Sequence, residues 1–207
     1  MTEEIWIADD IAEIRVPDVT SAQGVARRLR QTPFPFTEVV PGFDRVAVMF
    51  DPLTTTGQEV SSALSAALAG LRDEIPEERP VQIIRVQYGG EAGPDFDAVC
   101  DQVGLAAEAF IAAHTSVIHR VDLMGFTPGF AYISGVPEKW QVGRLAAPRA
   151  HVAAGSVGLI SGFTGLYALE GPGGWPLIGR TSHPLFQPQA DEPFALSAGQ
   201  KIRFEAA

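Results

Sequence analysis

The sequence lacks most of the features that assign a protein to a class at once. Cys100 is the only cysteine among its 207 residues, so no internal disulfide can form, as suits a reducing cytosol. Twenty-five acidic residues against 15 basic ones give a net charge of −10, which argues against a nucleic-acid partner or an anionic membrane surface. No apolar run approaches the ~20 residues that span a bilayer. With no signal peptide visible either, we expect a cytoplasmic protein without nucleic-acid or membrane partners.

Several catalytic and nucleotide motifs are also missing. The glycine loop 89–95 (GGEAGPD) has no lysine and matches neither the P-loop nor the dinucleotide fingerprint. Gly155-Ser156-Val157-Gly158 lacks the spacing of a nucleophile elbow. The four histidines are scattered, without a metal-ligand spacing. The sequence therefore predicts no metal site and no nucleotide site formed by a motif of this chain.

What is present is enough for a packed core, since 46% of the residues are hydrophobic. Residues 1–88 alternate between strand and helix patterns in the order β-α-β-β-α-β, the ferredoxin-like split motif. The class is therefore α+β, with a first domain at 1–88. Its expected elements are strands at 12–16, 37–40, 45–50 and 81–86, a helix capped by Thr20 or Ser21, and a second helix from about Thr56.

The pattern changes after Gly90. A helical region at 95–114 is broken near Gly104, and beyond it short apolar runs alternate with glycine and proline. That rhythm is typical of a closed or partly closed β-barrel, so residues 89–207 form the second predicted domain.

Two acidic residues and one histidine are candidates for acid–base chemistry. Glu91 and Asp95 flank the turn of the glycine loop, where they suit an acid/base pair or an ammonium ligand. Asp95 follows Pro94 and equally suits the N-terminus of a helix, which we favour. His114 ends a helix just before the barrel, where it either stabilises the helix dipole or takes part in catalysis.

Two arginines and one tryptophan are candidates for binding. Arg149 and Arg180 each lie between stiff or turn-forming neighbours, which suits bidentate binding of a carboxylate or phosphate, or else a salt bridge between domains. Trp175 follows two glycines and precedes Pro176. We expect its ring near a ligand or a partner protein, with core packing as the alternative.

These segments together resemble the allophanate hydrolase subunit 1 family, which includes the 5-oxoprolinase B subunits and the sporulation-kinase inhibitors. Two positions depart from the usual family pattern, since Gly143 precedes Arg144 and Ala153 precedes Ala154 where proline is usual. The resemblance implies a catalytic pair, Glu91 and His114, and a larger set of substrate-binding residues. That set is Phe126, Pro128, Phe130, Arg149, Ser156, Thr164, Trp175 and Arg180. The resemblance rests on YGGEAGPD at 88–95, HT at 114–115, GFTPGF at 125–130, PR at 148–149, AGSVG at 154–158, TGLY at 164–167 and PGGWPLIGRT at 172–181.

The resemblance also implies an architecture and an activity. The barrel would be cyclophilin-like, and the chain would pair with a homologous barrel protein, which is allophanate hydrolase subunit 2 or the C-type subunit of 5-oxoprolinase. The A-type subunit of 5-oxoprolinase would join them, and ATP used by the assembled complex would open 5-oxoproline to glutamate. A urea-derived amide is the alternative substrate. Inhibition of a histidine kinase by docking is the alternative of another class.

Overall fold

The computed structural model describes residues 5–69 and 80–207, and the chain divides into two compact units, Met1–Glu78 and Arg79–Ala207. Each unit has its own hydrophobic core. No helix in the described ranges is both long and apolar enough to cross a bilayer.

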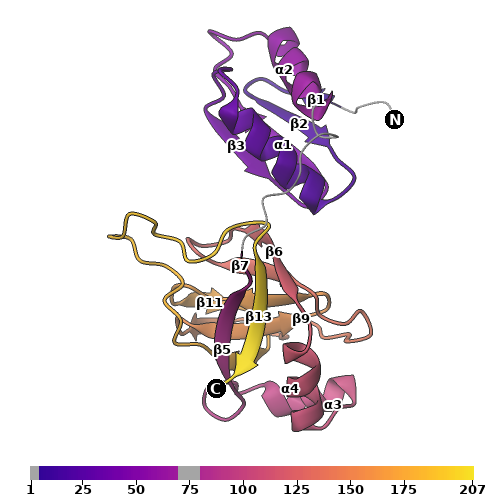
Figure 1. Cartoon of the computed structure of the whole chain (residues 1–207), viewed down its shortest axis with the longest axis vertical. Helices are drawn as coiled ribbons and strands as arrows, with labels where there is room; N and C mark the ends of the chain where they lie inside the picture. The colour runs from indigo at the N-terminus through magenta and orange to yellow at the C-terminus, as the bar shows by residue number, and fades with distance from the viewer. Residues whose placement is uncertain (1–4, 70–79) are drawn as a thin grey trace. The chain divides into compact units, whose positions relative to one another are not determined.

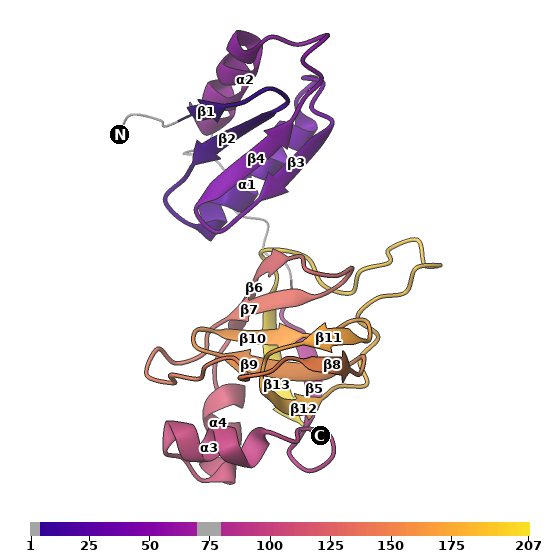
Figure 2. The ribbon, with the colours of Figure 1, turned by 180° about the vertical axis from the view of Figure 1, so that it is seen from behind.

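The first unit is a four-stranded antiparallel sheet with two helices on one face (Figures 1 and 2). The strands lie in the order β1-β2-β4-β3, and alternate residues such as Ile14, Val46 and Val48 are fully buried. Ala22, Val25, Ala26 and Leu29 of the first helix pack into this core, on the face that the sequence predicted. The elements are β1 (Ile5–Ile7), β2 (Ile11–Arg15), α1 (Val19–Gln31), β3 (Glu38–Pro41), β4 (Arg45–Met49) and α2 (Gly57–Ala69).

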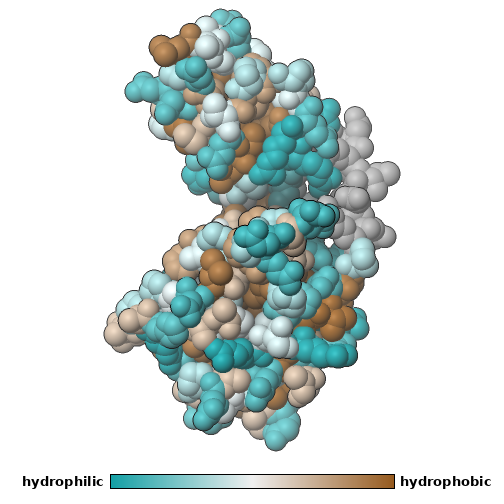
Figure 3. All heavy atoms as spheres, turned by 90° about the vertical axis from the view of Figure 1, so that its left-hand side faces the viewer, coloured by the Kyte–Doolittle hydropathy of each residue, from teal (hydrophilic) through white to brown (hydrophobic). Residues whose placement is uncertain are grey.

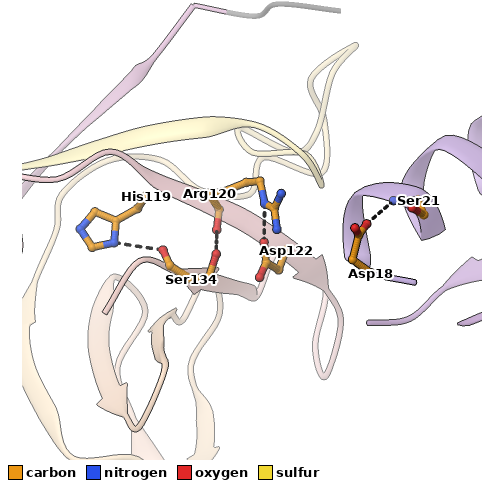
Figure 4. A network of polar contacts seen from close by, with 6 residues as sticks. All are labelled: Asp18, Ser21, His119, Arg120, Asp122 and Ser134. Carbon is orange, nitrogen blue, oxygen red and sulfur yellow. Dashed lines mark hydrogen bonds and ion pairs between the residues drawn. The ribbon is translucent and has the colours of Figure 1, made fainter. Parts of the chain in front are cut away.

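Side chains cap both helices of this unit. Asp18, rather than the predicted Thr20 or Ser21, is the N-cap of α1, and its Oδ1 accepts a bond of 2.8 Å from the Ser21 backbone N–H (Figure 4). Helix α2 begins after Thr56, as predicted. Glu59 accepts from the Thr56 backbone N–H at 2.8 Å while the Glu59 N–H bonds the Thr56 hydroxyl at 3.3 Å, a reciprocal capping box.

The ferredoxin-like arrangement is not confirmed, because the last predicted strand belongs to the barrel. That strand is β5 (Gln82–Tyr88), which pairs with a barrel strand on each side. The edge position beside β2 is taken instead by β1, which the sequence did not predict. Ile84 and Val86 are fully buried in the barrel core, so β5 has its apolar partners there.

The second unit is a closed seven-stranded barrel in the order β10-β7-β6-β13-β5-β12-β9. β13 runs parallel to β5, with Ile202 opposite Gln82 and Ala206 opposite Val86. A two-stranded ribbon of β8 and β11 accompanies the barrel (Figure 2). The remaining elements are α3 (Phe96–Val103), α4 (Ala107–Thr115), β6 (His119–Met124), β7 (Ala131–Ser134), β8 (Arg149–Val152), β9 (Ser156–Ile160), β10 (Phe163–Leu166), β11 (Gly171–Gly173), β12 (Leu177–Arg180) and β13 (Lys201–Ala206).

The helical region breaks at Gly104, as the sequence predicted. Gly104 ends α3 with a left-handed φ of 70°, and its N–H bonds back to the last turn of the helix. Some large hydrophobic side chains stay exposed on each unit, among them Trp6 and Val40 on the first and Phe126 and Phe194 on the second. Figure 3 shows such side chains mixed with hydrophilic ones over the visible face.

Candidate functional site

A cluster of aromatic rings joins several of the residues that the sequence singled out. The ring of Phe130 lies 5.5 Å from Phe126, 4.9 Å from Tyr167 and 5.8 Å from Trp175, each edge to face. Tyr132 meets both Phe130 and Trp175. Residues of β7 and of the loops that precede β7, follow β10 and precede β12 are thereby brought together. We call these five residues the aromatic cluster.

Trp175 is buried in this cluster, with 4% of its surface exposed. Gly165 of β10 and Gly158 of β9 are direct cross-strand partners, and their missing side chains make room for the indole. A Cβ on Gly165 would lie 2.7 Å from the Trp175 ring, closer than real contacts allow. In the single chain Trp175 therefore packs as the core alternative describes, and a place near a ligand or a partner protein stays a prediction. The sequence could not show where the paired glycines fall.

Phe126 is the exposed member of the aromatic cluster. Its ring is 62% exposed, and its φ of 73° makes it the only residue other than glycine with positive φ in the described ranges. The turn around it is closed by hydrogen bonds from Gly125 N to Phe130 O and from Phe130 N to Thr127 O. A bulky residue in the left-handed region carries backbone strain of the kind that clusters at functional sites. Pro128 is exposed on the same turn.

Arg149 is held beside the aromatic cluster by an acidic partner. Its Nη2 donates to Asp95 Oδ1 at 2.8 Å, and Asp95 Oδ2 accepts from the Leu177 backbone N–H at 2.6 Å. Asp95 stands at the N-terminus of α3, as favoured, but its side chain makes no cap bond. The Nη1 atom of Arg149 is enclosed and has no hydrogen-bond partner among the described residues. Nη2 of Arg149 is thus engaged by Asp95 while Nη1 has no hydrogen-bond partner among the described residues, and bidentate binding by Arg149 stays a prediction.

We expect substitutions of Arg149 and Asp95 to have non-additive effects on the free energy of unfolding. The pair is partly exposed, so a double-mutant cycle of Arg149→Lys and Asp95→Asn should give a coupling of about 1 kcal/mol in urea unfolding. Lysine keeps the charge but loses the planar fork. A coupling of zero, with loss of turnover for Arg149→Lys in the assembled complex, would return Arg149 to a substrate-binding role.

The glycine loop 89–95 packs against β12. Gly89 N donates to Ile178 O at 3.1 Å, and a Cβ on Gly93 would overlap the Ile178 backbone, so only glycine fits there. Glu91 is exposed on this loop, and its side chain makes no hydrogen bond or ion pair with the described residues. It is therefore open to a ligand or partner, whereas Asp95 on the same loop is committed to Arg149.

His114 lies in the barrel interior with no exposed surface. Its Nδ1 is 2.7 Å from the Tyr88 hydroxyl and its Nε2 is 2.8 Å from the Thr164 hydroxyl. A neutral imidazole satisfies both, because it accepts from one hydroxyl and donates to the other. The ring also stacks on Phe204 at 4.6 Å. The structure gives His114 a bridging role between β5 and β10.

A second buried histidine fastens the end of α4. His119 Nε2 is 2.8 Å from His114 O, and its Nδ1 is 3.1 Å from Ser134 O (Figure 4 shows this second contact). On the same strand Arg120 donates to Asp122 at 2.7 Å. Burial lowers the pKa of His114 well below its usual range, and His119 acts in the same direction. Burial likewise lowers the pKa of His119, opposed by its two carbonyl contacts.

These lowered pKa values predict a loss of stability in acid. The unfolded chain binds a proton at each histidine near pH 6.5, but the folded chain resists protonation until a lower pH. The free energy of unfolding should therefore be constant above about pH 7 and fall below pH 6.5, by up to about 1.4 kcal/mol per pH unit for each histidine. Urea unfolding at several pH values measures the slope. The exposed control variant His151→Gln should keep it, and a flat profile from pH 7 to 5 would contradict the prediction.

The remaining predicted residues lie at other places in the barrel. Ser156 is buried opposite exposed Arg180 in the β9–β12 pairing. Thr164 is fully buried on β10 against His114. The structure thus gathers Phe126, Phe130, Arg149 and Trp175. It pairs His114 with Thr164 and Ser156 with Arg180 at other places in the barrel.

Two residues of the site were not predicted. Arg144 has its guanidinium carbon 6.0 Å from the centre of the Trp175 ring, and Tyr167 packs against Trp175 in the aromatic cluster. The Arg144 segment is tied to the tryptophan loop by a bond of 2.8 Å from Leu145 N to Gly174 O. The alternation of basic residues with glycine and proline near 143–149 was the only signal for this placement. No group of metal-ligating side chains exists in the part of the chain that the structure describes.

The family model of the carboxyltransferase domain, subdomain C and D, matches residues 2–196. The chain belongs to this family. Two curated relatives agree, and both are B subunits of 5-oxoprolinase by name. The Escherichia coli O157:H7 protein is 38% identical over 180 residues, 87% of this chain and 82% of that one. The Bacillus subtilis (strain 168) protein is 34% identical over 190 residues, 86% of this chain and 79% of that one.

Solved structures share the architecture. The protein TTHA0988 superposes with a TM-score of 0.83 at 31% identity, over 95% of this chain. This chain spans only 40% of that longer protein. The uncharacterized protein PH0987 of Pyrococcus horikoshii matches with a TM-score of 0.59 at 33% identity, over 99% of this chain and 97% of that one. Urea carboxylase of Kluyveromyces lactis, at 15% identity and a TM-score of 0.74 over 99% of this chain and 22% of that one, shares the fold alone.

Proposed function

We propose that the chain is the B-type subunit of an ATP-dependent 5-oxoprolinase, which hydrolyses 5-oxoproline to glutamate. The observation that carries the proposal is the name shared by three curated relatives, each at least 34% identical over at least 86% of this chain. Phe126, the exposed member of the largely buried aromatic cluster, and the exposed Arg144 beside Trp175 offer an apolar and a cationic group, which suits a small anionic lactam.

The chemistry needs more than this chain. A lactam carbonyl is a poor electrophile, and transfer of a phosphoryl group to its oxygen activates the carbon for attack by water. The ring C–N bond then breaks to give an acyl phosphate, and hydrolysis of that acyl phosphate releases glutamate and phosphate. The sequence holds no nucleotide motif, so we assign ATP binding to another protein of the complex. We propose that Glu91, exposed on its glycine loop, acts as the acid or base of the complex, and that His114 acts only through the fold.

We further propose that the assembled enzyme is cytoplasmic and contains two other proteins, a homologous barrel subunit of the C type and a third subunit of the A type. TTHA0988 contains the counterpart of this chain within a chain of more than twice the length, which is consistent with a further part working beside this one. The barrel is proposed to be of the cyclophilin-like type.

The test is co-expression with the proteins encoded beside it, followed by ATP-dependent turnover of 5-oxoproline. The complex should release glutamate and phosphate, and the single chain should show neither ATPase nor lactamase activity. Turnover by the single chain would overturn its assignment as one part of a larger enzyme. Turnover of allophanate instead of 5-oxoproline would move the activity to the urea-derived amide, and inhibition of a histidine kinase without any turnover would assign the docking function.

A further inference from the structure

The two arginines beside Trp175 are in different electrostatic states. The charge of Arg149 is balanced by Asp95, at 2.8 Å. Because Asp95 is also anchored by the Leu177 N–H, its carboxylate cannot turn away to release the arginine without breaking a second hydrogen bond. One nitrogen of the Arg149 fork is therefore occupied and the other is enclosed.

Arg144 carries a charge that no acidic side chain of the described residues balances. Its side chain is exposed, and its guanidinium carbon lies over the Trp175 ring, 6.0 Å from the ring centre. A guanidinium stacked on a ring keeps its N–H edges free to donate in its own plane. The neighbouring Leu145–Gly174 bond holds the backbone at this place, so the arginine is not on a free loop.

The electrostatic surroundings of the neighbouring Tyr167 hydroxyl are positive. Burial raises the pKa of the Tyr167 hydroxyl, while the charges of Arg144 and Arg149 both act to lower it, and no carboxylate contributes. In a chain of net charge −10, Arg144 thus lies beside an aromatic ring without an acidic partner among the described residues. With Arg149 balanced by Asp95, one positive charge remains, which matches a monoanion.

We propose that Arg144 binds the carboxylate of a small ring-shaped monoanion at the edge of Trp175. This inference rests on the proposed function for the ligand's identity, 5-oxoproline, whose single carboxylate and flat lactam ring fit that description. It makes Arg144, and not Arg149, the residue that recognises the substrate's charge, with Asp95 and Arg149 as positioning residues behind it.

The test compares two ligands that differ by the carboxylate, 5-oxoproline and 2-pyrrolidinone. Equilibrium binding of each to the assembled complex without ATP is measured by calorimetry for the wild type, Arg144→Gln and Arg203→Gln. Arg203 is an exposed arginine on β13 and serves as the matched control. Arg144→Gln should weaken 5-oxoproline binding about ten- to a hundred-fold, the loss typical of a charge-assisted hydrogen bond, and leave 2-pyrrolidinone binding unchanged. Arg203→Gln should change neither.

In turnover, Arg144→Gln should raise KM with little change in kcat, because the carboxylate is bound alike before and during reaction. An equal loss for both ligands, no loss for either, or no measurable binding of 5-oxoproline would each overturn the proposal. The two proposals fail separately. If the complex binds 5-oxoproline through Arg144 but does not hydrolyse it with ATP, the proposed function is wrong and the Arg144 site stands. If the complex hydrolyses 5-oxoproline equally well with and without Arg144→Gln, the proposed function stands and the Arg144 site is wrong.

Discussion

Replacing Trp175 with alanine is expected to lower the free energy of unfolding by about 3–5 kcal/mol, the usual range for deleting a buried indole. The ring is 4% exposed and fills the space left by Gly158 and Gly165. Its removal leaves a cavity over Gly158 and Gly165, which have no side chains with which to fill it. Urea unfolding of the single chain measures the loss.

Trp6→Ala is the matched control, because Trp6 is 58% exposed on β1 and should cost well under 1 kcal/mol. A small loss at Trp175, with partner binding abolished, would show that the ring works at an interface and not in packing. Gly165→Ala offers an independent check, since its Cβ would press on the same ring and should destabilise the chain by about 1–3 kcal/mol.

Replacing His114 with alanine is expected to have an effect of similar size, about 3–5 kcal/mol. The change removes a fully buried ring stacked on Phe204 and leaves the hydroxyls of Tyr88 and Thr164 without their partner. A buried polar group that loses its hydrogen bond costs about 1–3 kcal/mol by itself. The loss should appear in the single chain, before any other protein of the complex is added.

The substitution Thr164→Val separates the hydrogen-bond contribution of His114 from its packing contribution. It keeps the shape at β10 but removes one hydroxyl, so it should cost about 1–2 kcal/mol. His151→Ala, at an exposed histidine, should be neutral. If His114→Ala leaves the melting temperature unchanged and abolishes turnover of the complex, His114 is a catalytic residue and the structural interpretation is wrong.

Local signals predicted most of the elements from the sequence. The apolar spacing of α1 and the break at Gly104 follow from rules that act within a few residues, and both are confirmed. The sequence could not predict the pairing partners of β5, because an alternating strand has the same residue pattern whether it pairs with β2 or with β13. Only the partner strands, far away in the chain, decide that.

The site shows the same division. The glycine clusters indicated loops of defined shape, and Gly93 and Gly165 do sit where any side chain would clash. What those glycines accommodate could not be known, since Gly165 faces an indole ten residues further on. The sequence also could not show which arginine has an acidic partner. Asp95 and Arg149 are far apart in sequence, so nothing local told the paired arginine from the unpaired Arg144.

The pairing of β13 with β5 also constrains the order of folding. β5 is the first barrel strand to leave the ribosome, yet its parallel neighbour at Lys201–Ala206 is the last. Until that strand emerges, β5 and β6 each present an unpaired edge, a state open to wrong pairing. The first unit pairs all its strands within residues 5–49 and does not share this delay. We therefore expect the nascent barrel to be more open to wrong strand pairing during synthesis than the first unit.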